Sequence, residues 1–193
     1  PTPDQRAGIG ELLYSDDFRT GEGWSLLTSP RGNVALSTNS LTLAVFGARA
    51  SVSSLLQGKI FGNFYLEITA RTSLCSGEDQ YGLLFREASN ADFYRFALTC
   101  NGQTRLDRLV GGTASSPQDW MFTSAVPVGP LGTVRLAVWA VGREMRFFIN
   151  DQFQFAVSDP MLSSGGIGVF ARSAGETALT VNFSDLEVYA VSP

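Results

Sequence analysis

The 193-residue sequence contains no histidine, which excludes several common kinds of active site. Histidine is the usual general base, the partner of nucleophilic serine and cysteine, and a frequent metal ligand. Any catalysis must therefore use carboxylates, and ligand binding could use arginine and aromatic side chains. Two carboxylates about 5 to 9 Å apart in a cleft could hydrolyse a glycosidic bond.

The acidic residues occur in small groups, each at an expected strand end or turn, where acids ordinarily face solvent. The groups are Asp16-Asp17, Glu78-Asp79, Glu87 with Asp92, and Asp185 with Glu187. None of them gathers into a convincing catalytic pair. Carboxylates suit calcium, and terminal strands often pair in sandwiches, so Asp16, Asp17 and Asp185 form a candidate calcium site. The alternative is that they are ordinary surface acids.

Arginine and aromatic side chains form the more promising set for ligand binding. Arginine offers planar, bidentate hydrogen bonding, and Lys59 is the only lysine. An exposed aromatic ring beside an arginine is suited to stacking on a ligand. The candidate ligand-binding residues are Arg86, Arg95, Trp120, Trp139, Arg146 and Phe148. The alternative is that loops such as 111–129 cover these faces.

Short runs of Phe, Tyr, Val, Ile and Leu, separated by Gly, Ser, Asn, Asp or Pro, predict an all-β sandwich or barrel. The expected strands are 12–17, 34–36, 41–45, 50–53, 63–72, 81–87, 93–100, 104–110, 133–141, 145–149, 153–157, 166–171 and 179–189. A hydrophobic share of 44% is typical of a packed domain. We expect residues 11–193 to form one domain and residues 1–10 to be a linker or the remnant of a tether.

Alternation along the strands predicts which side chains face the core. If Glu87 lies opposite Asp92, then Phe85 lies opposite Tyr94, and their neighbours continue one apolar face. Arg86 and Arg95 then lie on the opposite face. The hairpin that turns at 142–143 likewise places these residues outside: Arg135, Trp139, Arg146 and Phe148. The register through the turns at 101–102 and 150–151 stays open.

The two cysteines, Cys75 and Cys100, are expected at the same end of one sheet. A disulfide there would stabilise the fold by about 3 kcal/mol. It would favour a secreted or cell-surface location, the alternative being two reduced, buried thiols. The net charge of −4 argues against a nucleic-acid partner, and the longest apolar runs are too short for membrane insertion by this segment.

Several segments resemble the concanavalin A-like lectin and glucanase superfamily, specifically its laminin-G-like and family-16-glycosidase-like members in bacterial surface proteins. The segments are 15–18, 81–86 with 93–98, 134–157 around Phe148-Ile149-Asn150-Asp151, and 166–171 leading to 183–189. The resemblance implies a two-sheet antiparallel jelly roll with a groove on one sheet, faced by Arg86 and Arg95. The catalytic Glu-x-Asp-x-Glu pattern of the family-16 glucanases is absent from the sequence.

The sequence thus favours a non-catalytic carbohydrate-binding, adhesive or sensor module of an extracytoplasmic bacterial protein, with a saccharide or cell-surface glycan as its partner. Two alternatives stay open. A glycoside hydrolase would require Glu87, Asp92 or Asp107 to converge near the arginines. A protein-interaction domain would use the exposed aromatic faces to bind another protein or domain. No cofactor is expected apart from the candidate calcium ion.

Overall fold

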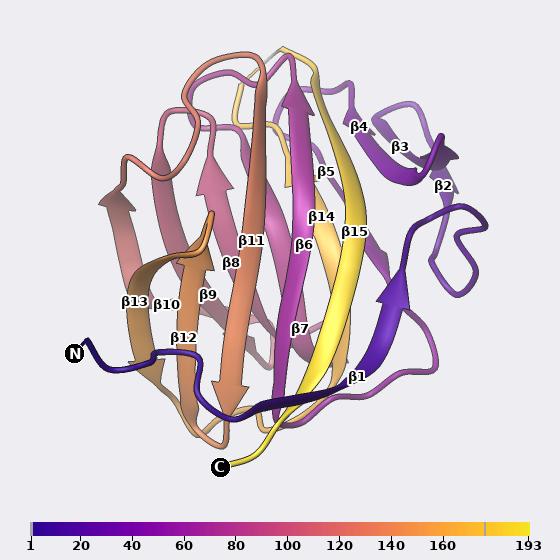
Figure 1. The fold of residues 1–193 in the computed structure, drawn as a ribbon. Helices are drawn as coiled ribbons and strands as arrows, with labels where there is room; N and C mark the ends of the chain where they lie inside the picture. The colour runs from indigo at the N-terminus through magenta and orange to yellow at the C-terminus, as the bar shows by residue number, and fades with distance from the viewer. Residues whose placement is uncertain (1, 176) are drawn as a thin grey trace.

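The computed structural model describes residues 2–175 and 177–193, which fold into two antiparallel sheets stacked face to face (Figure 1). The larger sheet has nine strands, in the order β13-β12-β11-β6-β15-β4-β3-β2, and β1 also pairs with β15. The smaller sheet has six strands, in the order β10-β9-β8-β7-β14-β5. The described residues include no helix long and apolar enough to cross a membrane.

The strands of the larger sheet are β1 (Ile9–Asp16), β2 (Leu27–Thr28), β3 (Gly32–Ser37), β4 (Ser40–Val45), β6 (Phe64–Ser73), β11 (Gly132–Val141), β12 (Glu144–Ile149), β13 (Gln152–Ser158) and β15 (Leu179–Val191). Those of the smaller sheet are β5 (Ser51–Leu55), β7 (Gln80–Ser89), β8 (Asp92–Thr99), β9 (Gln103–Val110), β10 (Thr113–Phe122) and β14 (Gly166–Arg172). The predicted jelly-roll sandwich is confirmed.

The core lies between the two sheets and is built from the inward residues of each strand. Phe85 pairs with Tyr94 across β7 and β8, as the alternation predicts. Phe96 from this sheet packs on Phe147 of the larger sheet, with ring centroids 4.9 Å apart. All four rings are fully buried. Interlocking aromatic rings therefore hold the two sheets together.

The hairpin between β7 and β8 closes differently from the expectation. Asp92 pairs with Ser89 and not with Glu87, so the residues Arg86 to Ala88 all lie opposite Phe93. Arg86 adopts a φ of 49°, a bulged conformation outside the regular strand. Gly165 approaches the bulge so closely that a Cβ there would lie 2.4 Å from the carbonyl carbon of Arg86. The expected pairing was wrong because alternation alone cannot locate a bulge.

The segment 111–129 was expected to be a loop, but its residues Thr113–Phe122 form the edge strand β10. Two register shifts interrupt its pairing with β9, which explains why its hydrophobic pattern is irregular. β10 extends the six-stranded sheet beyond β9. The strand β1 also begins before residue 11, since Ile9 already pairs with Val191.

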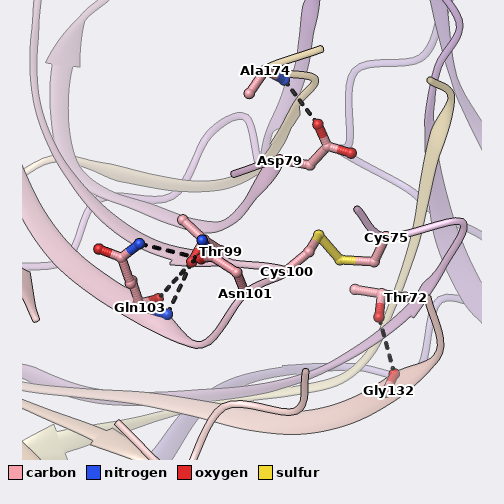
Figure 2. Close-up of a disulfide and its surroundings, with 9 residues drawn as sticks. All are labelled: Thr72, Cys75, Asp79, Thr99, Cys100, Asn101, Gln103, Gly132 and Ala174. Carbon is pink, nitrogen blue, oxygen red and sulfur yellow. Dashed lines mark hydrogen bonds between the residues drawn. A yellow bond between two sulfur atoms is a disulfide. The ribbon is translucent and has the colours of Figure 1, made fainter. Parts of the chain in front are cut away.

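A disulfide joins Cys75, which follows β6, to Cys100, which follows β8 (Figure 2). The two Cα atoms are 5.4 Å apart, and the described chain has no other cysteine. The predicted bridge is thus confirmed, but the expectation that both cysteines end strands of one sheet was wrong. β6 and β8 belong to different sheets, so the bridge links the two sheets at one end of the sandwich. Nearby, Asp79 accepts a hydrogen bond from the backbone N–H of Ala174.

We expect the double substitution Cys75→Ser with Cys100→Ser to lower the free energy of unfolding by about 3 kcal/mol, because the unfolded chain regains the entropy of a 25-residue loop. Guanidinium chloride unfolding followed by tryptophan fluorescence measures the change. Reductant should reproduce the loss in the wild-type protein and leave the double variant unchanged. Equal stability of the oxidised wild type and the variant would contradict this role.

Candidate functional site

The outer face of the six-stranded sheet carries a shallow groove over β5, β14, β7 and β8. Its volume is about 160 Å³, below the roughly 300 to 1,000 Å³ usual for small-molecule sites, so it suits a surface contact and not an engulfed ligand. The lining residues are Ser51, Val52, Ser53, Leu84, Phe93, Arg95, Phe170 and Arg172. None of these is acidic.

The floor of the groove is apolar. Leu84, Ala97 and Phe170 form a small buried cluster, against which Phe93 and Trp120 pack as partly exposed rings. Gly82 pairs with both Phe170 and Ala97, and a Cβ at this glycine would lie 2.0 Å from the carbonyl oxygen of Phe96. A Cβ at Gly82 would also lie 3.3 Å from the Phe170 ring, so the missing side chain leaves room for that ring on the floor of the groove.

A charged cluster borders this floor on β8 and β9. Arg95 donates from Nε to the Asp107 carboxylate at 2.9 Å and also places Nη2 2.8 Å from it. Arg105 forms a second ion pair with Asp107, at 2.6 Å, and the Ser116 hydroxyl donates a further hydrogen bond. One buried carboxylate therefore serves two arginines, so the cluster retains one net positive charge.

Both arginines of this cluster also lie over aromatic rings. The Arg95 guanidinium is 5.6 Å from the centroid of Phe170, and the Arg105 guanidinium is 4.2 Å from that of Trp120. Such stacking, together with the ion pairs to Asp107, holds both guanidinium groups in place, while 18% of the Arg95 side chain and 20% of the Arg105 side chain stay exposed. The groove therefore combines apolar surface with guanidinium groups held at its border.

Comparison with known proteins returns similar structures but no similar sequences. No family model matches the chain, and no curated protein matches it. The carbohydrate-binding module CBM66 from Bacillus subtilis superposes with a TM-score of 0.67 at 16% identity, covering 87% of this chain and 96% of that one. A Bacillus subtilis protein of unknown function with a galectin-like fold gives 0.70 at 15% identity, covering 96% and 99%.

The laminarinase catalytic domain from Thermotoga maritima gives a TM-score of 0.69 at 10% identity, covering 96% of this chain and all of that one. These superpositions span nearly whole domains. The chain has the concanavalin A-like fold. The resemblance inferred from the sequence is thus confirmed for the fold. Identities of 10 to 16% support a shared fold but do not show a shared activity.

Within this concanavalin A-like sandwich, the six predicted ligand-binding residues fall into three separate places. Arg95 and Trp120 lie on the groove face described above. Trp139, Arg146 and Phe148 lie on the outer face of the nine-stranded sheet, on the opposite side of the molecule. Arg86 belongs to neither face. Ligand contact by Arg95 and Trp120 stays a prediction.

Arg86 was expected beside Arg95 on an exposed face, but its side chain is fully buried. Its guanidinium donates to the backbone oxygens of Leu162 at 3.1 Å and Gly62 at 3.0 Å. Burial lowers the pKa of Arg86, and the neighbouring Tyr94 partly offsets this shift. The bulge in β7 causes the difference, because it removes Arg86 from the regular alternation of the strand.

The face of Trp139 and Phe148 is covered by the chain's own N-terminal segment, which crosses the ends of β12 and β11 (Figure 1). The Trp139 indole N–H donates to the Ala7 oxygen at 2.8 Å, and Arg146 donates to the Gln5 oxygen at 3.0 Å. Arg6 lies over the Phe148 ring at 5.1 Å. The alternative that part of the chain covers this face is therefore correct. Residues 5–7 cover it, however, and not the segment 111–129.

Two of the three candidate calcium ligands, Asp16 and Asp17, have carboxylates that are engaged by protein donors. The Asp16 carboxylate accepts hydrogen bonds from the Trp24 indole at 2.8 Å and the Phe18 N–H at 2.7 Å, while Asp17 pairs with Arg19. The backbone oxygen of Asp185 accepts from Arg135. Within the described residues no group of three acidic or cysteine side chains gathers around a common point. Calcium binding therefore stays an untested prediction.

Sequence reasoning missed much of the groove, namely Ser51, Ser53, Phe93, Phe170 and Arg172. Phe93 already shared a face with Arg95 in the predicted alternation, which was a usable signal. The others come from β5 and β14, and their place beside β7 depends on pairing between strands distant in sequence. No local pattern specifies such a pairing.

We expect Arg86→Met to lower the free energy of unfolding by about 2 to 4 kcal/mol, because two buried carbonyls lose their charged donor. Arg71→Met, at an exposed position on β6, is the matched control and should change stability by less than about 0.5 kcal/mol. Chemical denaturation measures both. Unchanged stability of Arg86→Met together with lost ligand binding would restore the role predicted from the sequence.

Arg6→Ala should lower the free energy of unfolding by about 1 kcal/mol, through loss of the contact with Phe148 and the ion pair with Asp151. Arg19→Ala removes a fully exposed pair and should change it by less than about 0.5 kcal/mol. Thermal and chemical unfolding of both variants provide the comparison. Equal effects would show that the Arg6 side chain adds nothing to the cover over Phe148.

Proposed function

We propose that the chain is a non-catalytic saccharide-binding module and that the groove on the six-stranded sheet is its binding site. The observation that carries the proposal is the pairing of partly exposed Phe93 and Trp120 with oriented arginine donors on one open face. Sugar rings present an apolar face and a polar rim, so they match a site of aromatic surface and directed hydrogen bonds.

The lack of carboxylates among the groove-lining residues favours binding over hydrolysis. Glycosidases use two carboxyl groups, one of which must exchange a proton. Asp107 is the acid that converges with Arg95, and its carboxylate is already bound by two guanidinium groups and the Ser116 hydroxyl. Asp92 is engaged by the Ser89 hydroxyl and the Gly111 N–H.

Two further observations are compatible with this function. The disulfide between Cys75 and Cys100 suits a chain that works outside the cytoplasm, where such bridges persist. The structural neighbours include a module named for carbohydrate binding and a domain named as a laminarinase. The protein-interaction alternative is less favoured, because the Trp139 face that it would use is already occupied by residues 5–7.

The proposal predicts that the wild-type protein binds at least one member of a panel of β-glucan, xylan, galactan, fructan and polygalacturonate oligosaccharides. Phe93→Ala should weaken that binding at least about tenfold, because a well-packed ring accounts for more than about 1.4 kcal/mol. Isothermal titration calorimetry measures the dissociation constants. Phe153→Ala, which truncates an exposed ring on the nine-stranded sheet, is the matched control.

Ser53→Trp provides a second test that leaves the core untouched, since Ser53 is exposed at the rim of the groove. The indole should fill the groove and abolish binding at an unchanged melting temperature. Binding that survives both Phe93→Ala and Ser53→Trp would place the site elsewhere. Absence of binding to the whole panel would overturn the proposed function.

A further inference from the structure

The basic residues of this chain are divided between paired and unpaired groups. Seven arginines form ion pairs with carboxylates of the described residues: Arg6, Arg19, Arg95, Arg105, Arg108, Arg135 and Arg146. The basic residues with no such pair within the described chain are Arg31, Arg49, Lys59, Arg71, Arg86, Arg143 and Arg172. Three members of this second group, Arg31, Arg49 and Arg172, lie at one corner of the sandwich, where β5 begins and β14 ends, and of the three Arg172 lines the groove.

Backbone hydrogen bonds bring these three arginines together from distant parts of the sequence. The Arg31 oxygen accepts from the Phe46 N–H at 2.8 Å, so Arg31 lies beside the turn that leads into β5. The Arg31 guanidinium donates to the Ala48 oxygen at 2.8 Å, in the same turn. Arg49 closes this turn, and its N–H donates to the Gly175 oxygen at 3.2 Å, in the loop after β14.

Arg172 ends β14 and connects this corner to the groove. It pairs with Ser51 of β5 and lines the groove together with Arg95 and Phe170. Arg31, Arg49 and Arg172 are all exposed, so their charges face solvent and can meet a ligand. A ligand that lies over Phe170 would therefore have Arg172 at its edge.

The charge of this region is positive although the whole chain is negative. The residues that line the groove include two arginines, Arg95 and Arg172, and no carboxylate. Asp107 pairs with both Arg95 and Arg105, so that cluster keeps one positive charge, and Arg172 adds a second. These two positive charges lie at the groove itself, against a net charge of −4 for the chain.

We propose that the groove selects saccharides that carry an anionic group, a carboxylate or a sulfate ester, and that Arg172 is the principal contact for that group. The inference rests on the proposed saccharide binding and adds the ligand class. A guanidinium binds such oxyanions through two parallel hydrogen bonds, which a neutral hydroxyl cannot match. Charges beyond about 8 Å are screened at physiological salt, so the local excess outweighs the distant acids.

The test compares three probes at 50 mM and 500 mM NaCl: galacturonate oligosaccharides, sulfated galactan oligosaccharides, and unsubstituted galactan oligosaccharides of equal length. We expect an anionic probe to bind at least about fivefold more tightly than the neutral one at low salt and to lose most of this advantage at high salt. The two anionic probes separate a carboxylate ligand from a sulfate ligand.

Arg172→Gln should weaken binding of the preferred anionic probe about fivefold more than it weakens binding of the neutral probe. Arg71→Gln removes the same charge from an exposed position on the nine-stranded sheet and is the matched control for net charge. Sodium galacturonate and sodium sulfate as free competitors distinguish recognition of the sugar from recognition of the anion alone.

The possible results separate this inference from the proposed function. Equal affinity for neutral and anionic galactans would overturn the anionic preference and leave saccharide binding in place. An equal effect of Arg172→Gln and Arg71→Gln would show that only net charge matters and would overturn the role of Arg172. No binding of any probe, together with no binding in the wider panel, would overturn both proposals.

Discussion

The alternation of side chains along each strand is the constraint on which this structure depends. Because successive residues point to opposite sides, two stacked sheets can bury one face each while the other face stays available. Phe85, Phe96 and Phe147 illustrate the buried side, where rings from both sheets pack on one another. This packing fixes how the sheets lie, and it thereby determines which residues remain outside.

The two outer faces use the same residue types for different purposes. On the nine-stranded sheet, Trp139 and Arg146 satisfy their donors with the backbone of residues 5–7. On the six-stranded sheet, Arg105 lies over Trp120 and Arg95 lies over Phe170, but Phe93 and Arg172 beside them stay accessible. Aromatic rings next to arginines thus build a covered structural face in one case and an open groove in the other. The two faces differ because another part of the chain covers one of them, and not because their residue types differ.

Interruptions of the alternation also have structural consequences. The bulge at Arg86 withdraws one guanidinium from the surface and uses it to hold the loops that contain Gly62 and Leu162. A buried arginine without a carboxylate partner is costly, and the two carbonyl acceptors offset part of that cost. The loops held in this way flank β14, whose outer residues Phe170 and Arg172 line the groove. The bulge at Arg86 therefore helps to hold the groove face of the six-stranded sheet in place.

The family resemblance implied the two-sheet arrangement. Sequence patterns alone determined the all-β class, the inward residues of β7, β8, β11 and β12, and the bridge between Cys75 and Cys100. Each of these follows from short-range signals, namely alternation, turn residues and the direction of consecutive strands. Only the tertiary structure decided that Arg86 is buried, that β10 is a strand, and that residues 5–7 cover Trp139. It alone brought Arg172 and Phe170 beside Arg95. Bulges, edge pairing and contacts between distant strands depend on the whole packed fold, and a local pattern carries no information about them.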